Sequence, residues 1–297
     1  MKFSLVVPTL NRVNELERLF QSFLAQDYGD FQVIVVDQNL DGRLDRLIAS
    51  YQAYFPILHL RESKRGQSRA RNIGFKHVQG DIVAFPDDDC LYPEGVLRSA
   101  SLFFQENPSL DGLIARVYDL DEEKNAFPGV GNDQSREVDY AKAYKDGISC
   151  GIFFRAPIAE KIRFDETLGP GAGTPWACSD EADFLHQCLD AGYRFYYDAT
   201  LIVRHPNPLK ENGFLKQIRR EYAYGVGNGY FLATHYLPQA FLKSERSASY
   251  KQASREIFKG NLRRASYALA KGMGVSRGYR AGLKRPEEIQ KTVAYAE

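Results

Sequence analysis

The alternation of short apolar runs with helical segments over the first 90 residues limits the fold of this chain more than any other feature. The runs KFSLVVP, FQVIVVD, ILHLRES and DIVAFPDDD each have strand length and end in polar residues. Residues 14–24 carry leucine and phenylalanine at helical spacing, and residues 68–80 form a second helical segment before the fourth run. This order predicts that residues 1–90 form the parallel half of a doubly wound α/β sheet.

Residues 91–209 continue the pattern less regularly. We expect strands at GLIARVY, SCGIFFRA and YRFYYDATLIVRH, and helices at PEGVLRSASLFFQEN and DEADFLHQCLDAG. Residues 120–147 are polar and irregular, as a loop over a site would be, and GPGAGTPW is typical of a flexible loop. The predicted fold is therefore a Rossmann-like mixed α/β sheet flanked by helices, with a helical, basic extension from residue 210.

The net charge of +1 hides a strong asymmetry. Residues 1–209 hold 22 Lys and Arg against 31 Asp and Glu, whereas residues 210–285 hold 16 against 4, so the basic third is a separate functional region or face. No apolar run is long enough for a signal peptide or a membrane span, and we expect a cytoplasmic protein. The four cysteines lack metal-type spacing, so we expect reduced thiols and no zinc site.

Acidic residues follow two of the predicted strands. Asp37 ends the second run, and Asp87, Asp88 and Asp89 follow the fourth. In an open α/β sheet, ligands bind outside the carboxyl ends of the strands, so these carboxylates should border one crevice. Asp87 and Asp89 point to one side of an extended backbone and suit a hard divalent cation that shares a phosphate-bearing ligand. The alternative is a solvated acidic turn.

A basic segment lies just upstream of the acidic one. KRGQSRARN supplies Lys64, Arg65, Arg69 and Arg71, which could bind phosphate oxygens while Mg²⁺ or Mn²⁺ takes the others. The alternative is an exposed helix face. Acidic and basic residues at one sheet edge together suggest a nucleoside diphosphate with its metal.

Several motifs in a fixed order resemble the family 2 glycosyltransferases of the GT-A fold. They are VVPTLNR, VIVVD, GQSRARNIGFKHVQGDIVAFPDDDC, GPGAGTPW, SDEADFLHQCLDAGYRFYYDATLIVRHP and YGVGNGYFLATHY, spread over residues 1–235. The resemblance implies an inverting, metal-dependent hexosyltransferase that uses a nucleotide-sugar, typically a UDP-sugar, in polysaccharide or other glycan biosynthesis. Residues 1–90 would be its nucleotide-binding half, 91–209 its acceptor and catalytic half, and 210–297 the helical basic region.

The resemblance also assigns roles to residues at the donor site. Asp37 would accept a hydrogen bond from the base, Arg71 would bind the diphosphate, and Asp89 would bind the metal. His205 would lie near the metal and the diphosphate, although a surface histidine held by the turn at Pro206 is the alternative. The remaining donor-binding residues would be Pro8, Thr9 and Asn11 at the nucleoside, Asp87 at the ribose side, and Asp88.

The general base is the point where this sequence departs from the family. Relatives have Glu-Asp at that position, whereas here the order is Asp180-Glu181, followed by Asp183. Ungapped alignment makes Glu181 the base, with Asp180 as the alternative, and both also suit the N-terminal dipole of a helix. Asp183 is a candidate for the acceptor side and Trp176 for contact with the acceptor or the donor sugar, although a single tryptophan is more often a packing anchor.

The C-terminal segment 251–285 contains ten Lys or Arg and one Glu. Phe258, Leu262, Ala265 and Leu269 recur at helical spacing, which predicts a helix lying on an anionic membrane surface. The alternatives are a helix packed on the catalytic domain with a solvated basic face and, ranked last, binding to nucleic acid. A lipid-linked acceptor, rather than a free saccharide, would explain a peripheral position at the inner face of a membrane.

Two rival functions remain open. A sugar-phosphate nucleotidyltransferase predicts a glycine-rich, basic phosphate loop after the first strand, and PTLNRVNE has no glycine there. A non-catalytic nucleotide-sugar or glycan-binding module would account for the swapped Asp180-Glu181 pair, and it predicts donor binding without turnover.

Overall fold

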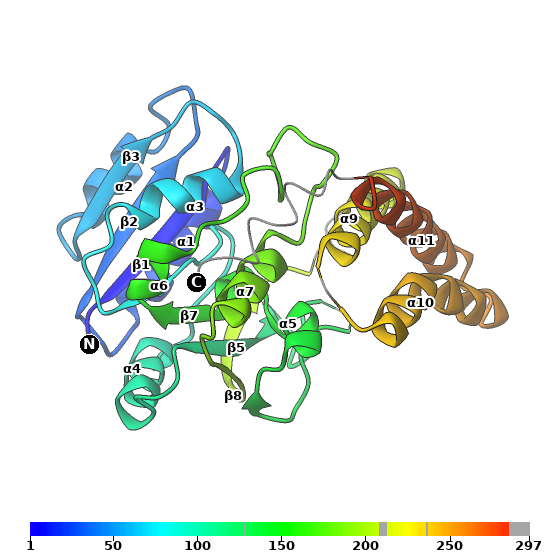
Figure 1. The fold of residues 1–297 in the computed structure, drawn as a ribbon. Helices are drawn as coiled ribbons and strands as arrows, with labels where there is room; N and C mark the ends of the chain where they lie inside the picture. The colour runs from blue at the N-terminus through cyan, green and yellow to red at the C-terminus, as the bar shows by residue number, and fades with distance from the viewer. Residues whose placement is uncertain (128, 208–212, 236, 285–297) are drawn as a thin grey trace.

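The computed structural model describes residues 1–127, 129–207, 213–235 and 237–284. In these residues an eight-stranded sheet lies beside three long C-terminal helices (Figure 1). The strands are β1 (Phe3–Thr9), β2 (Phe31–Asp37), β3 (Ile57–Arg61), β4 (Ile82–Ala84), β5 (Gly112–Asp119), β6 (Arg136–Glu137), β7 (Ile152–Arg155) and β8 (Phe195–His205). The helices are α1 (Asn14–Leu24), α2 (Asp45–Tyr51), α3 (Gln67–Phe75), α4 (Val96–Glu106), α5 (Tyr140–Asp146), the short 3₁₀ helix η1 (Ser149–Gly151), α6 (Pro157–Lys161), α7 (Asp180–Asp190), α9 (Phe214–Thr234), α10 (Gln239–Phe258) and α11 (Leu262–Gly282).

The sheet is mixed, as predicted. Its order is β3-β2-β1-β4-β7-β5-β8-β6. The first four strands are parallel, β7 is antiparallel to both β4 and β5, and β8 is parallel to β5. The parallel part corresponds to the predicted half 1–90, and the three strands expected after residue 91 are β5, β7 and β8.

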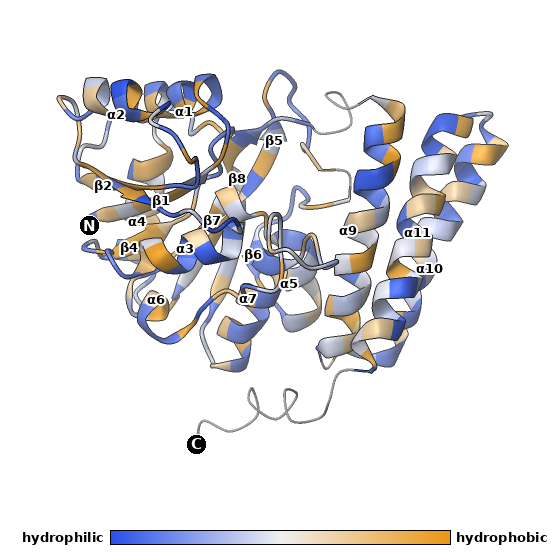
Figure 2. Ribbon diagram, turned by 90° about the horizontal axis from the view of Figure 1, so that it is seen from above, coloured by the Kyte–Doolittle hydropathy of each residue, from blue (hydrophilic) through white to orange (hydrophobic). Residues whose placement is uncertain are grey.

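Helices cover both faces of the sheet. In β1, Phe3, Leu5 and Val7 face the core shared with α1, α2 and α4, whereas Val6 faces the core shared with α3, α6 and α7. Figure 2 shows α1 and α2 on one side of the sheet and α3, α6 and α7 on the other. Because neighbouring side chains of a strand point to opposite faces, a strand buried on both sides is mostly apolar, and the buried Ser4 of β1 is bonded to Gln32 of β2. The four cysteines are free and buried, as predicted.

The segment 120–147 is more ordered than its sequence suggested. It contains β6, which pairs with β8, and the helix α5. Val138 and Ala143 are buried in the core shared with α7. These two apolar residues anchor a segment whose polar composition predicted only a loop.

The C-terminal helices pack closely through glycines. A Cβ atom on Gly229 of α9 would collide with the Val275 carbonyl of α11, and one on Gly278 would collide with the Val226 carbonyl. Glycine therefore lets the two backbones approach each other directly. α10 also packs against α11, and its Leu242 shares a small core with Phe231 of α9 and Val275 of α11. None of the helices in the described residues is both long and apolar enough to cross a membrane.

The prediction of one apolar stripe along a single helix at 258–269 is wrong. α10 ends at Phe258 and α11 begins at Leu262, so these two residues belong to different helices. Gly260 adopts a left-handed φ of 72°, and the Asn261 side chain accepts a hydrogen bond from the Arg264 amide as an N-cap. A glycine in this conformation followed by a capping asparagine ends one helix and starts the next.

Candidate functional site

Polar residues from several strand ends meet at one edge of the sheet. Thr9 ends β1 in register with Asp37, which ends β2. The acidic triplet, Asp87–Asp89, follows β4, and His205 ends β8. Because parallel strands end at the same edge, the topology places these groups along one side, with β1 between Asp37 and the triplet.

Asp37 is fully buried and hydrogen-bonded at both carboxylate oxygens. Its Oδ1 accepts from the backbone amide of Asn39 at 2.9 Å and from the side-chain amide at 2.7 Å. Its Oδ2 lies 3.0 Å from Nε2 of His59 on β3. Neither partner was predicted from the sequence, although Asn39 stands two residues from Asp37, as is typical of an Asx turn.

The loop after β1 is tied to the loop after β2. Asn11 has a left-handed φ of 62°, its amide donates to Asn39 Oδ1 at 2.8 Å, and its Oδ1 accepts from Arg43 at 2.9 Å. Thr9 is linked in the same way, because its carbonyl accepts from the Gln38 amide. Pro8 lies in the centre of the sheet as a residue of β1. The structure thus brings Pro8, Thr9 and Asn11 next to the strand end that carries Asp37.

Two arginines pair with the acidic triplet. Arg12, in the loop after β1, contacts Asp88 Oδ1 at 2.9 Å and also pairs with Asp89. Asp87 accepts from Arg71 at 3.0 Å and from Ser149 at 2.9 Å. Burial, joined by the charge of Asp89, raises the pKa of Asp88 to about 7, although Arg12 acts in the opposite direction. Three adjacent carboxylates are therefore held together by cations from outside the segment.

His205 points its ring at the triplet. Its Nδ1 lies 2.7 Å from the Pro206 carbonyl oxygen, which can only accept, so Nδ1 carries a proton. Nε2 faces Asp89 Oδ1 at 3.3 Å and Asp87 Oδ2 at 3.9 Å. A lone pair on Nε2 can face carboxylate oxygens only if a proton or a metal cation lies between them.

The spacing of Asp89 and His205 suits a divalent cation. Neighbouring ligands of an octahedral Mg²⁺ are about 3 Å apart, close to the observed separation. Within the described residues, no group of three or more His, Cys, Asp or Glu could hold a metal by itself. A cation here would therefore need oxygen ligands from water or from a bound molecule.

Arg71 connects the triplet to the start of α7. Its Nη2 donates to Asp87 at 3.0 Å and its Nη1 donates to Asp180 Oδ2 at 2.8 Å. The guanidinium is fully buried and lies 5.0 Å from the ring centroids of both Phe85 and Phe164. Arg71 thus holds two carboxylates from opposite sides of the site.

The other basic residues of segment 64–72 divide into two groups. Arg69 is paired with Glu62 at 3.0 Å and with Glu166 at 3.1 Å. Lys64 and Arg65 are exposed. Only the latter two have the exposure expected of side chains that reach for the phosphates of an incoming ligand.

Asp180 and Glu181 begin α7 and lie side by side. Asp180 is buried, and its carboxylate fills the space beside Gly169, which has a φ of 91° and where a Cβ would come within 2.7 Å of the Asp180 carboxyl carbon. Burial and the neighbouring charge of Asp180 raise the pKa of Glu181 well above its usual range. The first turn of α7 thus presents one carboxylate held by Arg71 and one with raised proton affinity.

Helix α9 holds the residues just before the start of α7 in place. Ser179, the residue before α7, has a left-handed φ of 71°, and its hydroxyl donates to Asn228 Oδ1 on α9 at 2.8 Å. Cys178 donates to the same oxygen at 3.0 Å, and Gly227 packs directly against Cys178. Nothing in the sequence indicated that Asn228, about fifty residues away, orients the carboxylates of α7.

Trp176 and Asp183 also face α9. The Trp176 ring stacks on Tyr230 with centroids 4.1 Å apart and 15° between the planes. Asp183 contacts His235 at 2.9 Å and accepts from Gln187 at 2.7 Å. The structure therefore places both residues at the contact between α7, its preceding loop and α9.

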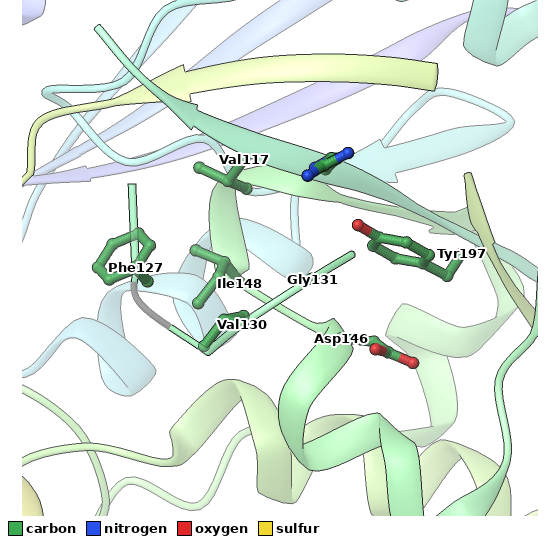
Figure 3. Close-up of a pocket in the computed structure, with 8 residues that line it drawn as sticks. Val117, Phe127, Val130, Gly131, Asp146, Ile148 and Tyr197 are labelled. Atoms are coloured by element: carbon green, nitrogen blue, oxygen red, sulfur yellow. The ribbon is translucent and has the colours of Figure 1, made fainter. Parts of the chain in front are cut away.

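A small pocket lies next to His205 on the side of β5. Its lining includes Val117, Phe127, Ile148 and Tyr197, with Phe127 and Ile148 facing each other in Figure 3. The Phe127 ring centroid is 4.9 Å from that of His205. This pocket is small, and its lining includes Asp146 but no residue of the acidic triplet or of α7. Phe127 in its wall packs against the ring of His205.

Comparison with known proteins gives consistent matches. The profile of a family described as Glycosyl transferase family 2 matches residues 4–163. An uncharacterized glycosyltransferase of Haemophilus influenzae is 32% identical over 110 residues, which are 36% of this chain and 36% of that protein. The poly(ribitol-phosphate) beta-N-acetylglucosaminyltransferase TarS of Staphylococcus aureus is 29% identical over 121 residues, 39% of this chain but 21% of TarS. The chain thus spans about a third or less of the length of these two relatives.

Solved structures match over more of the chain. A mannosyltransferase of Pyrobaculum calidifontis, in complex with GDP-Man and Mn²⁺, has a TM-score of 0.64 and 19% identity, covering 98% of this chain and 83% of that one. Residues 1–349 of TarS have a TM-score of 0.57 and 16% identity, covering 100% and 93%. The same part of TarS is also known in complexes with UDP and with UDP-GlcNAc.

Proposed function

The chain belongs to glycosyltransferase family 2 and has the predicted GT-A fold, and from this premise we propose that it transfers a sugar from a nucleotide-sugar to an acceptor hydroxyl with inversion at the anomeric carbon. The observation that carries the proposal is the bridge made by Arg71 between Asp87 and Asp180. It holds a donor-side carboxylate and the carboxylates of α7 at one site. A transferase needs donor-side and acceptor-side groups close together, because the leaving group departs from the same carbon that the acceptor hydroxyl attacks.

We assign the donor to the strand ends of the parallel half. Asp37 would accept from the base, with Pro8, Thr9 and Asn11 beside it. UDP-sugar is the favoured donor class, supported by the UDP complexes of a structural relative. Asp87 and Asp88 would border the ribose and diphosphate, and Lys64 and Arg65, which are exposed, would bind phosphate oxygens. Arg71 would act through Asp87, as a positioning residue.

We assign Mg²⁺ or Mn²⁺ to Asp89 and His205. The 3.3 Å separation and the direction of the His205 lone pair fit this assignment, and Arg12 would have to give up its contact with Asp89. When bound, the cation would neutralise charge on the departing diphosphate. The Mn²⁺ complex of the Pyrobaculum calidifontis mannosyltransferase supports the choice of metal.

We assign the general base to Glu181. Asp180 is held by Arg71, whereas burial and the charge of Asp180 raise the pKa of Glu181, which favours proton uptake by its carboxylate. The Glu181 carboxylate takes the proton of the acceptor hydroxyl as that oxygen bonds to the anomeric carbon. The bond from that carbon to the diphosphate breaks at the same time, and the diphosphate leaves with the electron pair.

The acceptor side is the open end of the site. A saccharide or a lipid-linked sugar would approach past Trp176, which is partly exposed and stacks on Tyr230. Asp183 is engaged with His235 and Gln187. We therefore propose that Asp183 orients α7 against α9 and acts on the acceptor only indirectly.

Donor binding and donor turnover test the proposal separately. Calorimetric titration with UDP, GDP and dTDP, each with Mn²⁺ and with EDTA, should give metal-dependent binding of one nucleotide. Asp89→Asn should remove the metal dependence, whereas Glu94→Gln, an exposed carboxylate five residues away, should retain it. Equal affinity of the wild type with Mn²⁺ and with EDTA would refute the metal site.

A non-catalytic binding module is the second candidate, because the Asp180-Glu181 order is swapped. Slow hydrolysis of the bound nucleotide-sugar measures turnover without knowledge of the acceptor. The transferase predicts hydrolysis that Glu181→Gln reduces and Glu160→Gln, on the exposed side of α6, does not. Tight donor binding with no hydrolysis or transfer in any variant would favour the module.

A further inference from the structure

The tip of the α10–α11 hairpin exposes large apolar side chains that no other described element covers. Ile257 is 51% exposed, Phe258 92% and Leu262 69%. They flank the tight turn at Gly260. Figures 1 and 2 both show this turn at the outer end of the hairpin, away from the sheet. Apolar groups in contact with water are unfavourable, and a cluster of them at one projecting point marks a contact surface.

The exposure is not a consequence of how the hairpin is built. Its inner side has its own apolar contacts, because Ala253 of α10 and Ala265 and Ala268 of α11 are buried. Polar residues at the tip would leave those contacts intact. The folded hairpin therefore does not need Phe258 or Leu262 in their exposed positions.

Cations surround the apolar tip. The exposed ones are Lys251, Arg255, Lys259, Arg263 and Arg264. Glu256 is the only acid within 251–285, and it lies 3.7 Å from Lys259. The tip therefore combines three apolar side chains with a strong excess of positive charge.

We propose that this tip binds the surface of an anionic lipid bilayer. Ile257, Phe258 and Leu262 would enter the boundary between headgroups and acyl chains, and the surrounding Lys and Arg would contact lipid phosphates. This geometry differs from the helix lying flat that the sequence predicted, because only the end of the hairpin makes contact. The charge and the apolar residues of the tip favour an anionic bilayer over a second copy of the chain and over nucleic acid. A second copy would bring two basic tips together, and nucleic acid would leave three apolar side chains without a matching surface.

The proposal does not depend on the donor or the chemistry, so it is tested on the whole protein without substrate. Flotation with vesicles of phosphatidylcholine, and with vesicles in which roughly a quarter of the lipid is phosphatidylglycerol, measures the partition coefficient. We expect binding only to the anionic vesicles, weakening as salt rises. Phe258→Ser with Leu262→Ser should lower the coefficient by about tenfold or more. Each of Lys259→Gln and Arg263→Gln should lower it by about fivefold.

Matched controls lie on the opposite end of the molecule. Tyr54→Ser replaces a similarly exposed apolar residue of the parallel half, and Arg18→Gln replaces an exposed cation of α1. Both should bind vesicles as the wild type does. Circular dichroism and thermal unfolding report whether each variant is folded.

Three outcomes would overturn the proposal. The wild type could fail to bind anionic vesicles, or the tip variants could bind as tightly as the controls. Sedimentation could also show a dimer that Phe258→Ser with Leu262→Ser dissociates, which would make a second copy the partner.

Discussion

Charged side chains are buried and paired at one end of this molecule and exposed to water at the other. At the sheet edge, Arg71 and Asp180 are buried and face each other at 2.8 Å. On the α10–α11 hairpin, Arg255 and Arg264 are exposed to water. Removing one member of a buried pair leaves the other charge without a partner, whereas water and salt screen exposed charges. The same kind of substitution should therefore have a large effect at the sheet and a small one on the hairpin.

Arg71→Met should give the largest loss of stability. We expect it to lower the free energy of unfolding by about 3–5 kcal/mol, because Asp87 and Asp180 would lose their shared cation. Arg69→Met is the matched control two residues away. Its ion pairs with Glu62 and Glu166 are partly exposed, so about 0–1 kcal/mol is expected. Urea unfolding measures both, and equal losses would remove the contrast between buried and exposed charges.

Glu181→Gln should reduce donor turnover by about 10²–10⁴-fold while nucleotide affinity stays unchanged. Its raised pKa also sets the sign of the pH dependence. The base acts when deprotonated, so kcat should rise with pH through the range of that raised pKa and level off above it. A rate already constant from mildly acidic pH upward would show that a carboxylate of ordinary pKa is the base.

Asn228→Ala should have an intermediate effect on the rate of transfer, because Asn228 joins α9 to the start of α7. Without its oxygen, the Ser179 and Cys178 hydrogen bonds are lost and the start of α7 can shift. We expect kcat to fall by about tenfold to a hundredfold with donor KM little changed, because only the base moves. Lys216→Ala, exposed in the first turn of α9, is the control. Loss of donor affinity instead would mean that α9 supports the donor site.

Arg264→Gln should have the smallest effect on stability. A change of less than about 0.5 kcal/mol in the free energy of unfolding is expected for this exposed side chain. Thermal unfolding at low and high salt measures it. A larger, salt-sensitive loss would mean that the exposed cations of the hairpin stabilise the fold as the buried arginine at the sheet edge does.

Sequence patterns located most elements because the signals were local. The short apolar run of β1 and the helical spacing of Leu16, Leu19 and Phe20 are properties of neighbouring residues. The break at Gly260 and Asn261 also had a local signal, a glycine before an N-cap residue, which the spacing of apolar residues concealed. Arg12 was likewise within a recognised motif, but its role depends on Asp88, which is 76 residues away.

Long-range partners were beyond sequence reasoning. Ser149 on η1 donates to Asp87, and Asn228 accepts from Ser179. Both residues lie in segments that the sequence singled out, SCGIFFRA and YGVGNGYFLATHY, but no pattern there indicates these partners. Trp176 was assigned to sugar or to packing, and only the stacked Tyr230 shows that one ring face is covered. The partners of these residues come from distant segments of the chain, so they are known only from the folded structure.

The sequence by itself determined which chemical groups stand at the strand ends, because strand period and strand termination are properties of adjacent residues. Strand patterns placed Asp37 and the acidic triplet at one edge of the sheet, and the family resemblance added His205. The tertiary structure alone decided how their charges are satisfied. Arg71 reaches Asp180 across 109 positions, and Phe258 is left exposed where two helices turn. Burial and pairing depend on which distant segments pack together, and that is settled by the whole fold.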